Sequence, residues 1–227
     1  MNNKTYTGLI ASTMLFATLQ TPATAGPGDE ARKHVDMAQA TLSNFLRDPN
    51  MSWLQSNLPN TKGVLIVPKV VKAGFIFGGS GGRGVLLVRS ETGKWNGPAF
   101  YNVGTASVGF QAGVSVSEVV MMVMTDKGVN SLLSSSMKVG GDASVAAGPT
   151  GEGVTSTIPE DLVSFSRSKG LYGGLNMEGA VIKPADDWNS AYYGKEVLPP
   201  AILLKGELHN KQADKLVKMV ADAAKAK

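Results

Sequence analysis

Basic side chains are concentrated in one stretch of this chain, between residues 62 and 94. The stretch contains a single acidic residue, Glu91, so it is locally basic although the whole chain carries a formal net charge of only +4. Each Lys or Arg close to an anionic bilayer contributes about 1 kcal/mol of attraction, so a group of five could hold a protein reversibly on a membrane. The pattern indicates an anion-binding surface, and an ordinary scatter of surface charge is the alternative. The candidate lipid-binding residues are Lys62, Lys69, Lys72, Arg83 and Arg89.

The same stretch is a poor match to a nucleic-acid site. Proteins that bind single strands display aromatic rings among their basic side chains, so that bases can stack on them. The nearest aromatic residues, Phe75 and Phe77, fall instead within an apolar run that is predicted to be a strand. Nucleic acid is therefore not an expected partner.

Residues that could perform catalysis are few and far apart. The two histidines, His34 and His209, lie near opposite ends of the chain, with no carboxylate or cysteine at a metal-ligand spacing. The chain contains no cysteine, which excludes thiolate metal sites and cysteine nucleophiles. Glu178 is the one carboxylate in an apolar run, where an acid usually faces solvent or pairs with a base such as Arg167 or Lys169. We therefore predict no catalytic residue, no metal site and no cofactor, and an enzyme acting on lipid is the less favoured alternative.

A glycine-rich segment, residues 79–84, matches the G-x-G-x-x-G spacing of dinucleotide-binding loops. That fingerprint works because the glycine turn opens a helix whose N-terminus holds the pyrophosphate. Here residues 85–89 continue as a predicted strand, so the helix is missing and the match is interpreted as fortuitous. Because glycine restrains the backbone poorly, we expect residues 78–84 to form a mobile hairpin that carries Arg83 at its tip, in contact with headgroups.

The first 25 residues have the pattern of a secretory signal peptide. Lys4 supplies a positive start, residues 8–19 form a short apolar core, and Ala23 and Ala25 fit the A-x-A cleavage pattern. A membrane anchor is the alternative, but a span needs about 20 apolar residues and this core is shorter. Cleavage after Ala25 would leave residues 26–227 as one domain, periplasmic or secreted and peripheral at a membrane.

Hydrophobic periodicity predicts helices at both ends of the remaining chain and strands between them. Apolar residues at spacings of three and four make residues 29–47 an amphipathic helix, which either packs on the sheet or lies in a lipid interface. A final helix is expected over residues 207–226, with the apolar stripe Leu208, Leu216, Val220 and Ala224. Strands are expected at residues 64–67, 74–78, 84–89, 99–104, 107–116, 119–125, 144–147, 163–168 and 171–182, and short helices at 127–135 and 184–193.

The order of these elements predicts the fold class. Strands dominate the middle without intervening helices, which is typical of an α+β fold with a mostly antiparallel sheet. Glycines within the predicted strands mark bends or close approach of neighbouring backbones. We therefore expect a single domain in which N- and C-terminal helices cover a curled, mostly antiparallel, glycine-rich sheet.

Three glycine-punctuated apolar blocks follow one another in a fixed order. They are residues 62–89, residues 144–151 (SVAAGPTG) and residues 164–182 (SFSRSKGLYGGLNMEGAVI), followed by WNSAYYG at 188–194. In this order and spacing they resemble the SYLF domain, over roughly residues 30–206. In that family the domain binds phosphoinositides and other anionic lipids, and some fungal members also bind and bundle actin filaments.

The resemblance implies a binding module rather than a catalyst. A bacterial periplasm contains no actin and normally no phosphoinositide, so what transfers to an exported chain is affinity for anionic headgroups, such as phosphatidylglycerol or cardiolipin. The leading hypothesis is an exported module that binds an anionic phospholipid membrane through the five basic residues named above. The alternative is an envelope adaptor or structural protein whose sheet edge or C-terminal helix binds another protein or, as in eukaryotic members, actin filaments.

Overall fold

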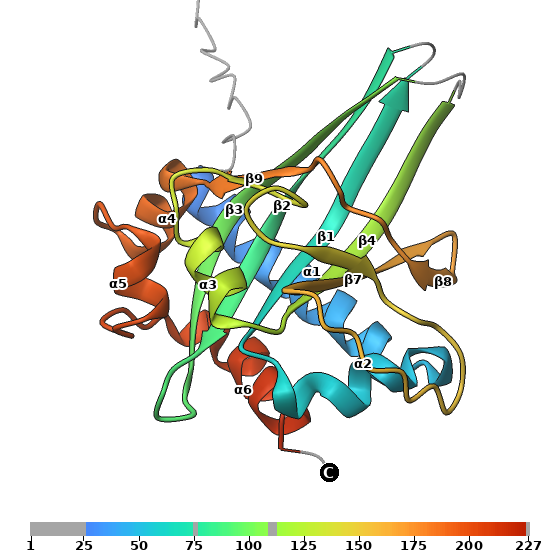
Figure 1. Ribbon diagram of the computed structural model, residues 1–227. Helices are drawn as coiled ribbons and strands as arrows, with labels where there is room; N and C mark the ends of the chain where they lie inside the picture. Colours follow the sequence, from blue (N-terminus) through green and yellow to red (C-terminus); the bar gives the residue numbers. More distant parts are fainter. Residues whose placement is uncertain (1–25, 75–76, 109–112, 226–227) are drawn as a thin grey trace, which may run out of the picture.

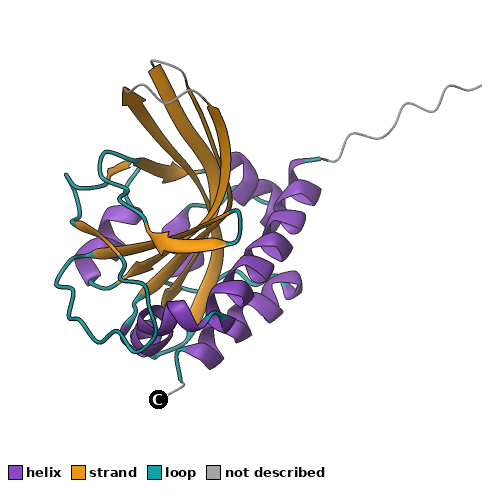
Figure 2. Ribbon diagram, turned by 90° about the vertical axis from the view of Figure 1, so that its right-hand side faces the viewer, coloured by secondary structure: helices purple, strands orange, loops and turns teal. Residues whose placement is uncertain are grey.

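One large sheet with helices on both of its faces forms the body of the protein (Figures 1 and 2). The computed structural model describes residues 26–74, 77–108 and 113–225, and the predicted signal peptide lies outside them. The helices are α1 (Pro27–Arg47), α2 (Ser52–Asn57), α3 (Asp126–Leu132), α4 (Asp186–Tyr193), α5 (Pro199–Leu203) and α6 (Asp214–Ala223), with 3-10 turns η1 (Pro49–Met51), η2 (Leu58–Asn60) and η3 (Lys211–Ala213). The strands are β1 (Gly63–Gly74), β2 (Phe77–Arg89), β3 (Trp95–Val108), β4 (Gly113–Val123), β5 (Met137–Lys138), β6 (Val145–Ala147), β7 (Leu162–Ser168), β8 (Leu171–Gly174) and β9 (Val181–Pro184).

The described strands form a single nine-stranded sheet. Their order is β5-β9-β3-β2-β1-β4-β7-β6, and β8 pairs with β7. Only the β6–β7 pair is parallel, and every other described pair is antiparallel. Figure 2 shows the sheet as a strongly curled layer with helices along its convex side. The predicted α+β class, with a curled and mostly antiparallel sheet between terminal helices, is confirmed.

Helix α1 covers one face of the sheet, beside α4 and α6. Its apolar side includes Val35, Leu42 and Phe45, each at most 1% exposed, and packs against strand residues such as Ile66 and Phe100. Full burial of one large apolar side chain contributes about 1.5–3 kcal/mol, which makes this contact a major part of the fold's stability. Of the two placements predicted for residues 29–47, the structure has the helix packed on the sheet.

The last helix belongs to the same core. α6 begins at Asp214, later than the start predicted at residue 207: residues 207–210 have no regular secondary structure, and the 3-10 turn η3 precedes the helix. Leu216 and Val220 from the predicted apolar stripe are fully buried against the α1 core. Leu208, also predicted to belong to this stripe, lies before the helix and packs on the opposite face of the sheet, so that part of the prediction is wrong. The stripe on α6 is covered by the protein itself and is not a free surface for a partner.

A second core lies on the opposite face of the sheet. It contains Leu65, Leu86, Tyr101 and Met121 from the long strands, together with Ile182 from β9. Residues of α3 and α5 complete it, and Figure 1 shows α3 in front of the sheet while α1 lies behind. Both faces of the sheet are therefore covered within the body of the molecule.

The mobile hairpin predicted at residues 78–84 is wrong. These residues are the middle of β2, and Gly82 pairs with Val70 on β1 and with Val103 on β3. The glycine is needed for close approach, since a Cβ on Gly82 would lie 2.4 Å from the carbonyl oxygen of Lys69. The register of β1 is irregular between Ile66 and Lys69, and a side chain on the neighbouring strand would not fit there.

Two other predicted strands are divided in the structure. The strand expected at 171–182 is split into β8 and β9, and Gly179 adopts a φ of +79° in the turn between them. The strand expected at 107–116 belongs to two elements, β3 and β4, and residues 109–112 lie outside the described part. Both short helices are confirmed as α3 and α4, and Gly194 ends α4 with a φ of +71°.

Asp161 connects four segments at the start of β7. Its carboxylate accepts hydrogen bonds from the Thr125 hydroxyl at 2.6 Å and the Ser144 backbone N–H at 2.9 Å, and lies 3.1 Å from the Lys127 ammonium. Burial of this side chain acts to raise its pKa, but the hydrogen bonds from Thr125, Ser144 and Lys127 outweigh burial and lower the pKa to about 2. The ionised carboxylate therefore stabilises the junction of β4, α3, β6 and β7.

Acid should remove this stabilisation within a defined window. A carboxyl pKa lowered from 3.8 to about 2 stabilises the fold above pH 3.8, and the contribution is lost as the pH falls towards 2. Asp161→Asn should therefore lower the free energy of unfolding by about 2 kcal/mol at pH 7, with a smaller difference from the parent at pH 2. Urea denaturation, followed by tryptophan fluorescence at several pH values between 2 and 7, measures the free energy of unfolding of both proteins. The exposed control Glu152→Gln should change the free energy of unfolding by less than about 0.5 kcal/mol at pH 7. A deficit for Asp161→Asn that is the same at pH 7 and pH 2 would contradict the assignment.

Candidate functional site

Four strands extend past the helices as a projecting arm (Figure 1). We call residues 69–74, 77–83, 102–108 and 113–117 of β1–β4 the distal arm. β9 pairs with β3 only over residues 101–104, and β7 pairs with β4 only from Ser117 onward. Beyond those positions the described sheet is four strands wide, in the order β3-β2-β1-β4.

One face of the distal arm is apolar. Cross-strand pairing forms two rows, Gly104–Gly81–Val71–Val116 and Ala106–Gly79–Ala73–Val114. Because side chains alternate along a strand, these rows share the side of Val85 and Leu87, which pack under α1. Val71, Val116 and Val114 are 38%, 49% and 74% exposed. This surface, called the valine face below, continues the core of the body beyond the reach of its helices.

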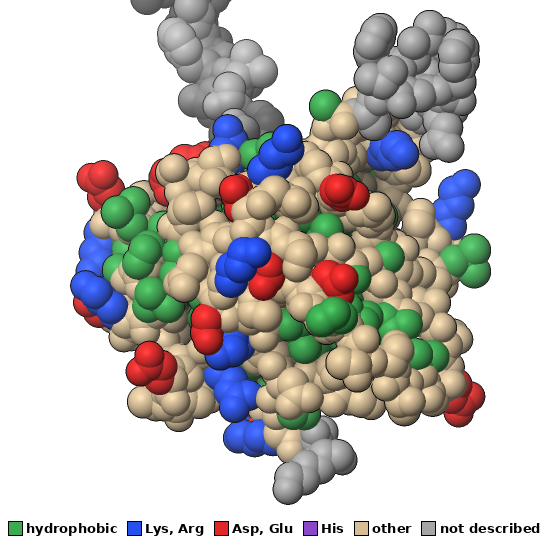
Figure 3. All heavy atoms as spheres, in the orientation of Figure 1, with side chains coloured by type: hydrophobic (Ala, Val, Ile, Leu, Met, Phe, Trp, Pro, Cys, Tyr) green, Lys and Arg blue, Asp and Glu red, His purple; other side chains and the backbone are tan. Residues whose placement is uncertain are grey.

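The other face of the distal arm carries hydroxyl groups. Pairing forms the row Thr105–Ser80–Lys72–Ser115, and the Ser80 and Thr105 hydroxyl oxygens lie 2.7 Å apart. Figure 3 views this side of the molecule, and backbone and uncharged polar atoms predominate on the arm below the grey residues. The described arm is therefore amphipathic, with an apolar face and a polar face.

A polar band separates the valine face from the core under α1. It consists of Lys69, Arg83, Asn102, Glu118 and Arg167, from five neighbouring strands. Glu118 accepts a hydrogen bond from the Thr41 hydroxyl of α1 at 2.8 Å and forms an ion pair with Arg167 at 3.0 Å. The band therefore joins the edge of α1 to the sheet at the level where the helical cover ends.

Arg83 is the most restrained member of the band. Its guanidinium carbon lies 4.1 Å from the centre of the Trp188 ring, and its Nε donates to the Asn102 side-chain oxygen at 3.0 Å. A terminal nitrogen lies 3.9 Å from the Asp187 carboxylate. The predicted position of Arg83 at a hairpin tip is therefore wrong, and its partners come from β3 and α4.

The Arg83 backbone is held as well. The Nε2 atom of His34 on α1 donates to the Arg83 carbonyl oxygen at 2.7 Å, and its ring meets Trp188 edge-on at 5.3 Å. Burial lowers the pKa of His34, despite the opposing effect of this hydrogen bond, so the ring is neutral at pH 7. His34 is thus a structural contact between α1 and β2.

The five predicted basic residues do not form one surface. Lys69 and Arg83 are direct cross-strand neighbours in the polar band, whereas Lys72 projects from the hydroxyl face of the arm. Lys62 and Arg89 lie at the opposite end of the same strands, where Gly63 pairs with Val88. Sequence reasoning missed the valine face, although the alternation Val114-Ser115-Val116-Ser117 is the period-two signal of a two-sided strand.

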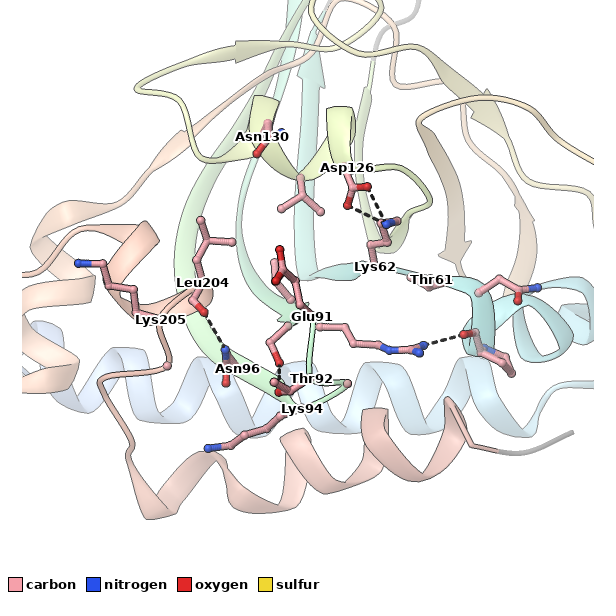
Figure 4. Close-up of a pocket in the computed structure, with 18 residues that line it drawn as sticks. Thr61, Lys62, Glu91, Thr92, Lys94, Asn96, Asp126, Asn130, Leu204 and Lys205 are labelled. Atoms are coloured by element: carbon pink, nitrogen blue, oxygen red, sulfur yellow. Dashed lines mark hydrogen bonds and ion pairs between the residues drawn. The ribbon is translucent and has the colours of Figure 1, made fainter.

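Lys62 and Arg89 line a pocket of about 880 Å³ at the base of the strands (Figure 4). Both are engaged with the protein: Lys62 forms an ion pair with Asp126 at 2.7 Å, and Arg89 donates to the Pro59 carbonyl oxygen at 2.7 Å. Glu91 and Asp126 also line the pocket, which therefore contains carboxylates as well as cations (Figure 4). Because the pocket contains both signs of charge, it should attract an anionic ligand less than the distal arm, whose described residues include no acid.

The other candidate groups have structural surroundings. His209 hydrogen-bonds to Asp214 at 2.6 Å on the surface, and Glu178 is exposed in a turn, while its predicted partner Arg167 pairs with Glu118. Within the described residues, no three His, Asp or Glu side chains are grouped closely enough to hold a metal ion. No helix in that part of the chain has both the length and the apolar character needed to cross a membrane.

Comparison with known proteins gives a consistent family. The Ysc84 family, described as "Las17-binding protein actin regulator", matches residues 104–223. An SH3 domain-containing protein of Schizosaccharomyces pombe is 32% identical over 155 residues, which cover 65% of this chain and 36% of that protein. Protein YSC84 of Saccharomyces cerevisiae is 31% identical over 153 residues, 64% of this chain and 32% of its own length. The SH3 domain-containing YSC84-like protein 1 of Bos taurus is 27% identical over 168 residues, 72% of this chain and 49% of the relative.

The chain therefore spans between about a third and a half of the length of these relatives. Two of the three are named as SH3 domain-containing proteins. No solved structure matches the chain.

Replacement of Arg83 should destabilise the fold. Arg83→Ala removes the stacking on Trp188 and the hydrogen bond to Asn102, and we expect a loss of about 1–2 kcal/mol in the free energy of unfolding. Lys72→Ala, on the exposed hydroxyl face, should change it by less than about 0.5 kcal/mol. Urea denaturation of both variants measures the difference, and equal stability would show that the Arg83 contacts do not hold α4 to the sheet.

Proposed function

The chain belongs to the Ysc84, or SYLF, family of Las17-binding actin regulators, and we propose that it is a non-enzymatic module that binds anionic lipid at a membrane surface. The distal arm is the contact surface in this proposal. The observation that carries it is the valine face, an exposed apolar sheet surface that ends at a band of charged side chains.

The order of polarity along the arm suits a bilayer interface. The valine face extends four residues beyond Lys69, to the row of Ala73 and Val114, which is about 13 Å at the rise of a strand. Interfacial elements bury their apolar surface about 5–10 Å below the headgroups and keep charged groups at headgroup level. The valine face would lie in the apolar layer, and Lys69 and Arg83 would face the headgroups.

The charge of the arm favours anionic lipid. The described residues of the distal arm include Lys69, Lys72 and Arg83 and no acidic residue. At about 1 kcal/mol each, the two lysines give a modest and salt-sensitive attraction, and Arg83, which stacks on Trp188 and lies near Asp187, adds less. Lys62 and Arg89 lie at the far end of the strands, so in this orientation they would contact a second anionic surface or none.

The site of action is part of the proposal. The pattern of the first 25 residues motivates export, followed by work in a periplasm or outside the cell, peripheral to a membrane. Anionic phospholipid is then the ligand within reach. Detection of the processed chain in a periplasmic fraction, starting at Gly26, tests this; retention of the full chain in the cytoplasm would overturn it.

A protein partner is the second candidate. The family is described as "Las17-binding protein actin regulator", and a relative in Saccharomyces cerevisiae is named LAS seventeen-binding protein 3. The edges of the arm beyond β9 and β7 could accept a strand of another protein. Co-sedimentation with purified actin filaments, without lipid, separates the two functions. Pelleting with filaments, together with indifference to vesicles, would favour the protein-binding function.

Reversing the charge on the arm should weaken vesicle binding. Lys69→Glu/Lys72→Glu replaces attraction by repulsion. The affinity for phosphatidylglycerol-containing vesicles, measured from the fraction that pellets with them, should fall at least about tenfold at low salt. The same measurement on Lys195→Glu/Lys215→Glu, with an equal change of charge elsewhere, should show a much smaller loss. If Lys62→Glu/Arg89→Glu loses as much as the arm variant, the base of the strands is the contact instead.

The apolar contribution should be separable from the charge. Val114→Asp/Val116→Asp places carboxylates on the valine face, and binding should fall about tenfold or more even at a salt concentration that already screens the lysines. Leu198→Asp/Leu204→Asp, at sites that are 64% and 48% exposed on another surface, adds the same charge as the matched control and should bind normally. Normal binding by the double valine variant would exclude the valine face from the contact.

A further inference from the structure

The pocket at the base of the strands lies at the opposite end of β1 and β2 from the distal arm (Figure 4). Four segments that are far apart in the sequence line it: the turn before β1, the hairpin between β2 and β3, helix α3 and the residues after α5. Its volume of about 880 Å³ falls within the range of about 300–1,000 Å³ that is usual for small-molecule sites. None of its described lining residues belongs to the distal arm, so a ligand here would bind independently of the membrane contact.

Some of the charge in this pocket is already used within the protein. Lys62 and Asp126 form an ion pair at 2.7 Å. Arg89 donates through one terminal nitrogen to the Pro59 carbonyl oxygen, and its other side-chain N–H groups donate to nothing in the described part of the chain. A guanidinium with free N–H groups can hold a carboxylate or a phosphate through two parallel hydrogen bonds. Arg89 can therefore bind the anionic group of a ligand.

Glu91 supplies the opposite charge in the same pocket. Its carboxylate forms no ion pair with the described basic residues, although Arg89 and Lys94 also line the pocket. Lys94 likewise has no acidic partner among the residues that the structure describes. Opposite charges that line one pocket without pairing suit a ligand that carries both.

Asn96 adds a hydrogen-bond acceptor to the pocket. Its side chain is only 7% exposed, and its amide nitrogen donates to the Leu203 carbonyl oxygen at 3.0 Å. Its Oδ1 atom accepts no hydrogen bond within the described chain, yet only the Tyr101 hydroxyl there is both unpaired and shut off from solvent, so Oδ1 is accessible. Gly206, with a φ of +61°, leaves it uncovered, because a Cβ at that position would lie 2.7 Å from this oxygen.

We infer that this pocket binds a small zwitterion, a molecule in which a few bonds separate an ammonium group from a phosphate or carboxylate group. The anionic group binds the free N–H groups of Arg89, and Lys94 adds positive charge to the same pocket. The ammonium group donates to the Glu91 carboxylate and to the Oδ1 atom of Asn96. Free metabolites and the headgroup of a zwitterionic phospholipid both have this chemistry.

A ligand with a single charge fits the pocket less well. An anion is opposed by the carboxylates of Glu91 and Asp126, and a cation is opposed by Arg89 and Lys94. Like-charge contacts of this kind are a usual source of specificity. The preference should differ from that of the distal arm, whose described residues include no acid.

Nuclear magnetic resonance titration of the isotope-labelled protein tests the inference with defined probes. Glycerophosphoethanolamine carries both charges and N–H donors, whereas glycerophosphocholine carries the same charges without an N–H group. Glycerophosphoglycerol supplies only the anionic group, and ethanolamine supplies only the ammonium group. Glycerophosphoethanolamine, and the carboxylate zwitterion β-alanine, should shift the amide signals of residues 89–96 saturably. The other three probes should bind at least about tenfold more weakly.

Variants of Glu91 test which charge selects the ligand. Glu91→Gln keeps the size of the side chain and removes its charge, so the affinity for glycerophosphoethanolamine should fall about tenfold or more. Glu196→Gln, at an exposed site outside the pocket, is the matched control and should bind normally. Glu91→Lys should invert the preference, because glycerophosphoglycerol would then meet added positive charge.

Vesicles distinguish a lipid headgroup from a free compound. Vesicles of phosphatidylethanolamine and phosphatidylcholine carry no net charge. Pelleting with them that survives Lys69→Glu/Lys72→Glu and is lost in Glu91→Gln would assign the pocket to a lipid headgroup. Saturable shifts with the soluble probes, without pelleting on these vesicles, would assign it to a free zwitterion.

Three results would overturn the inference: no saturable shift with either zwitterion, equal affinity for glycerophosphoglycerol and glycerophosphoethanolamine, or normal binding by Glu91→Gln. Equal affinity for glycerophosphocholine would exclude Glu91 and Asn96 as acceptors of hydrogen bonds from the ammonium group. Because the titration uses soluble probes, its result does not depend on whether the distal arm binds anionic vesicles.

Discussion

A sheet with two apolar faces needs cover on both, and in this protein the strands are longer than the helices can cover. α1, α4 and α6 close one face of the body, and α3 and α5 close the other. The four longest strands pass beyond all of them. Where the cover ends, the chain replaces large apolar side chains by glycine, alanine and valine on one face and by hydroxyl groups on the other. The arm is a consequence of this difference in length.

The polar band makes the transition possible. Each long strand passes from a part covered by helices to a part that is exposed. At this boundary, water could reach the core between α1 and the sheet. Arg83 covers that position with its aliphatic stem and its guanidinium group, which stacks on Trp188. Beside α1, Glu118 and Arg167 form an ion pair. Long charged side chains can cover apolar surface in this way and still keep their charge at its edge. The same residues thus seal the body and define the start of the proposed contact surface.

The sequence was sufficient for the class of fold and insufficient for the site. Periodicity identified the first helix, and the order of the elements identified the antiparallel sheet, because both depend on local patterns of burial. The hairpin predicted at residues 78–84 failed since glycine was interpreted as freedom of the backbone, whereas Gly82 meets a need for close approach that only the neighbouring strand reveals. Likewise, basic residues that are close in sequence lie far apart in the structure. Lys62 immediately precedes β1, and Lys72 lies ten residues further along the extended chain, about 33 Å away at the rise of a strand.

The unbroken course of β1 and β2 from the core to the arm has a mechanical consequence. A pull on the arm along its long axis acts parallel to the strands, and the hydrogen bonds between them lie across that direction. Such a load is shared by many bonds in shear instead of opening them one at a time. Force applied at the projecting end is therefore carried into the body, beneath α1, without a flexible joint in the described residues of these strands. We therefore expect the arm and the body to resist separation by a force that acts along the strands.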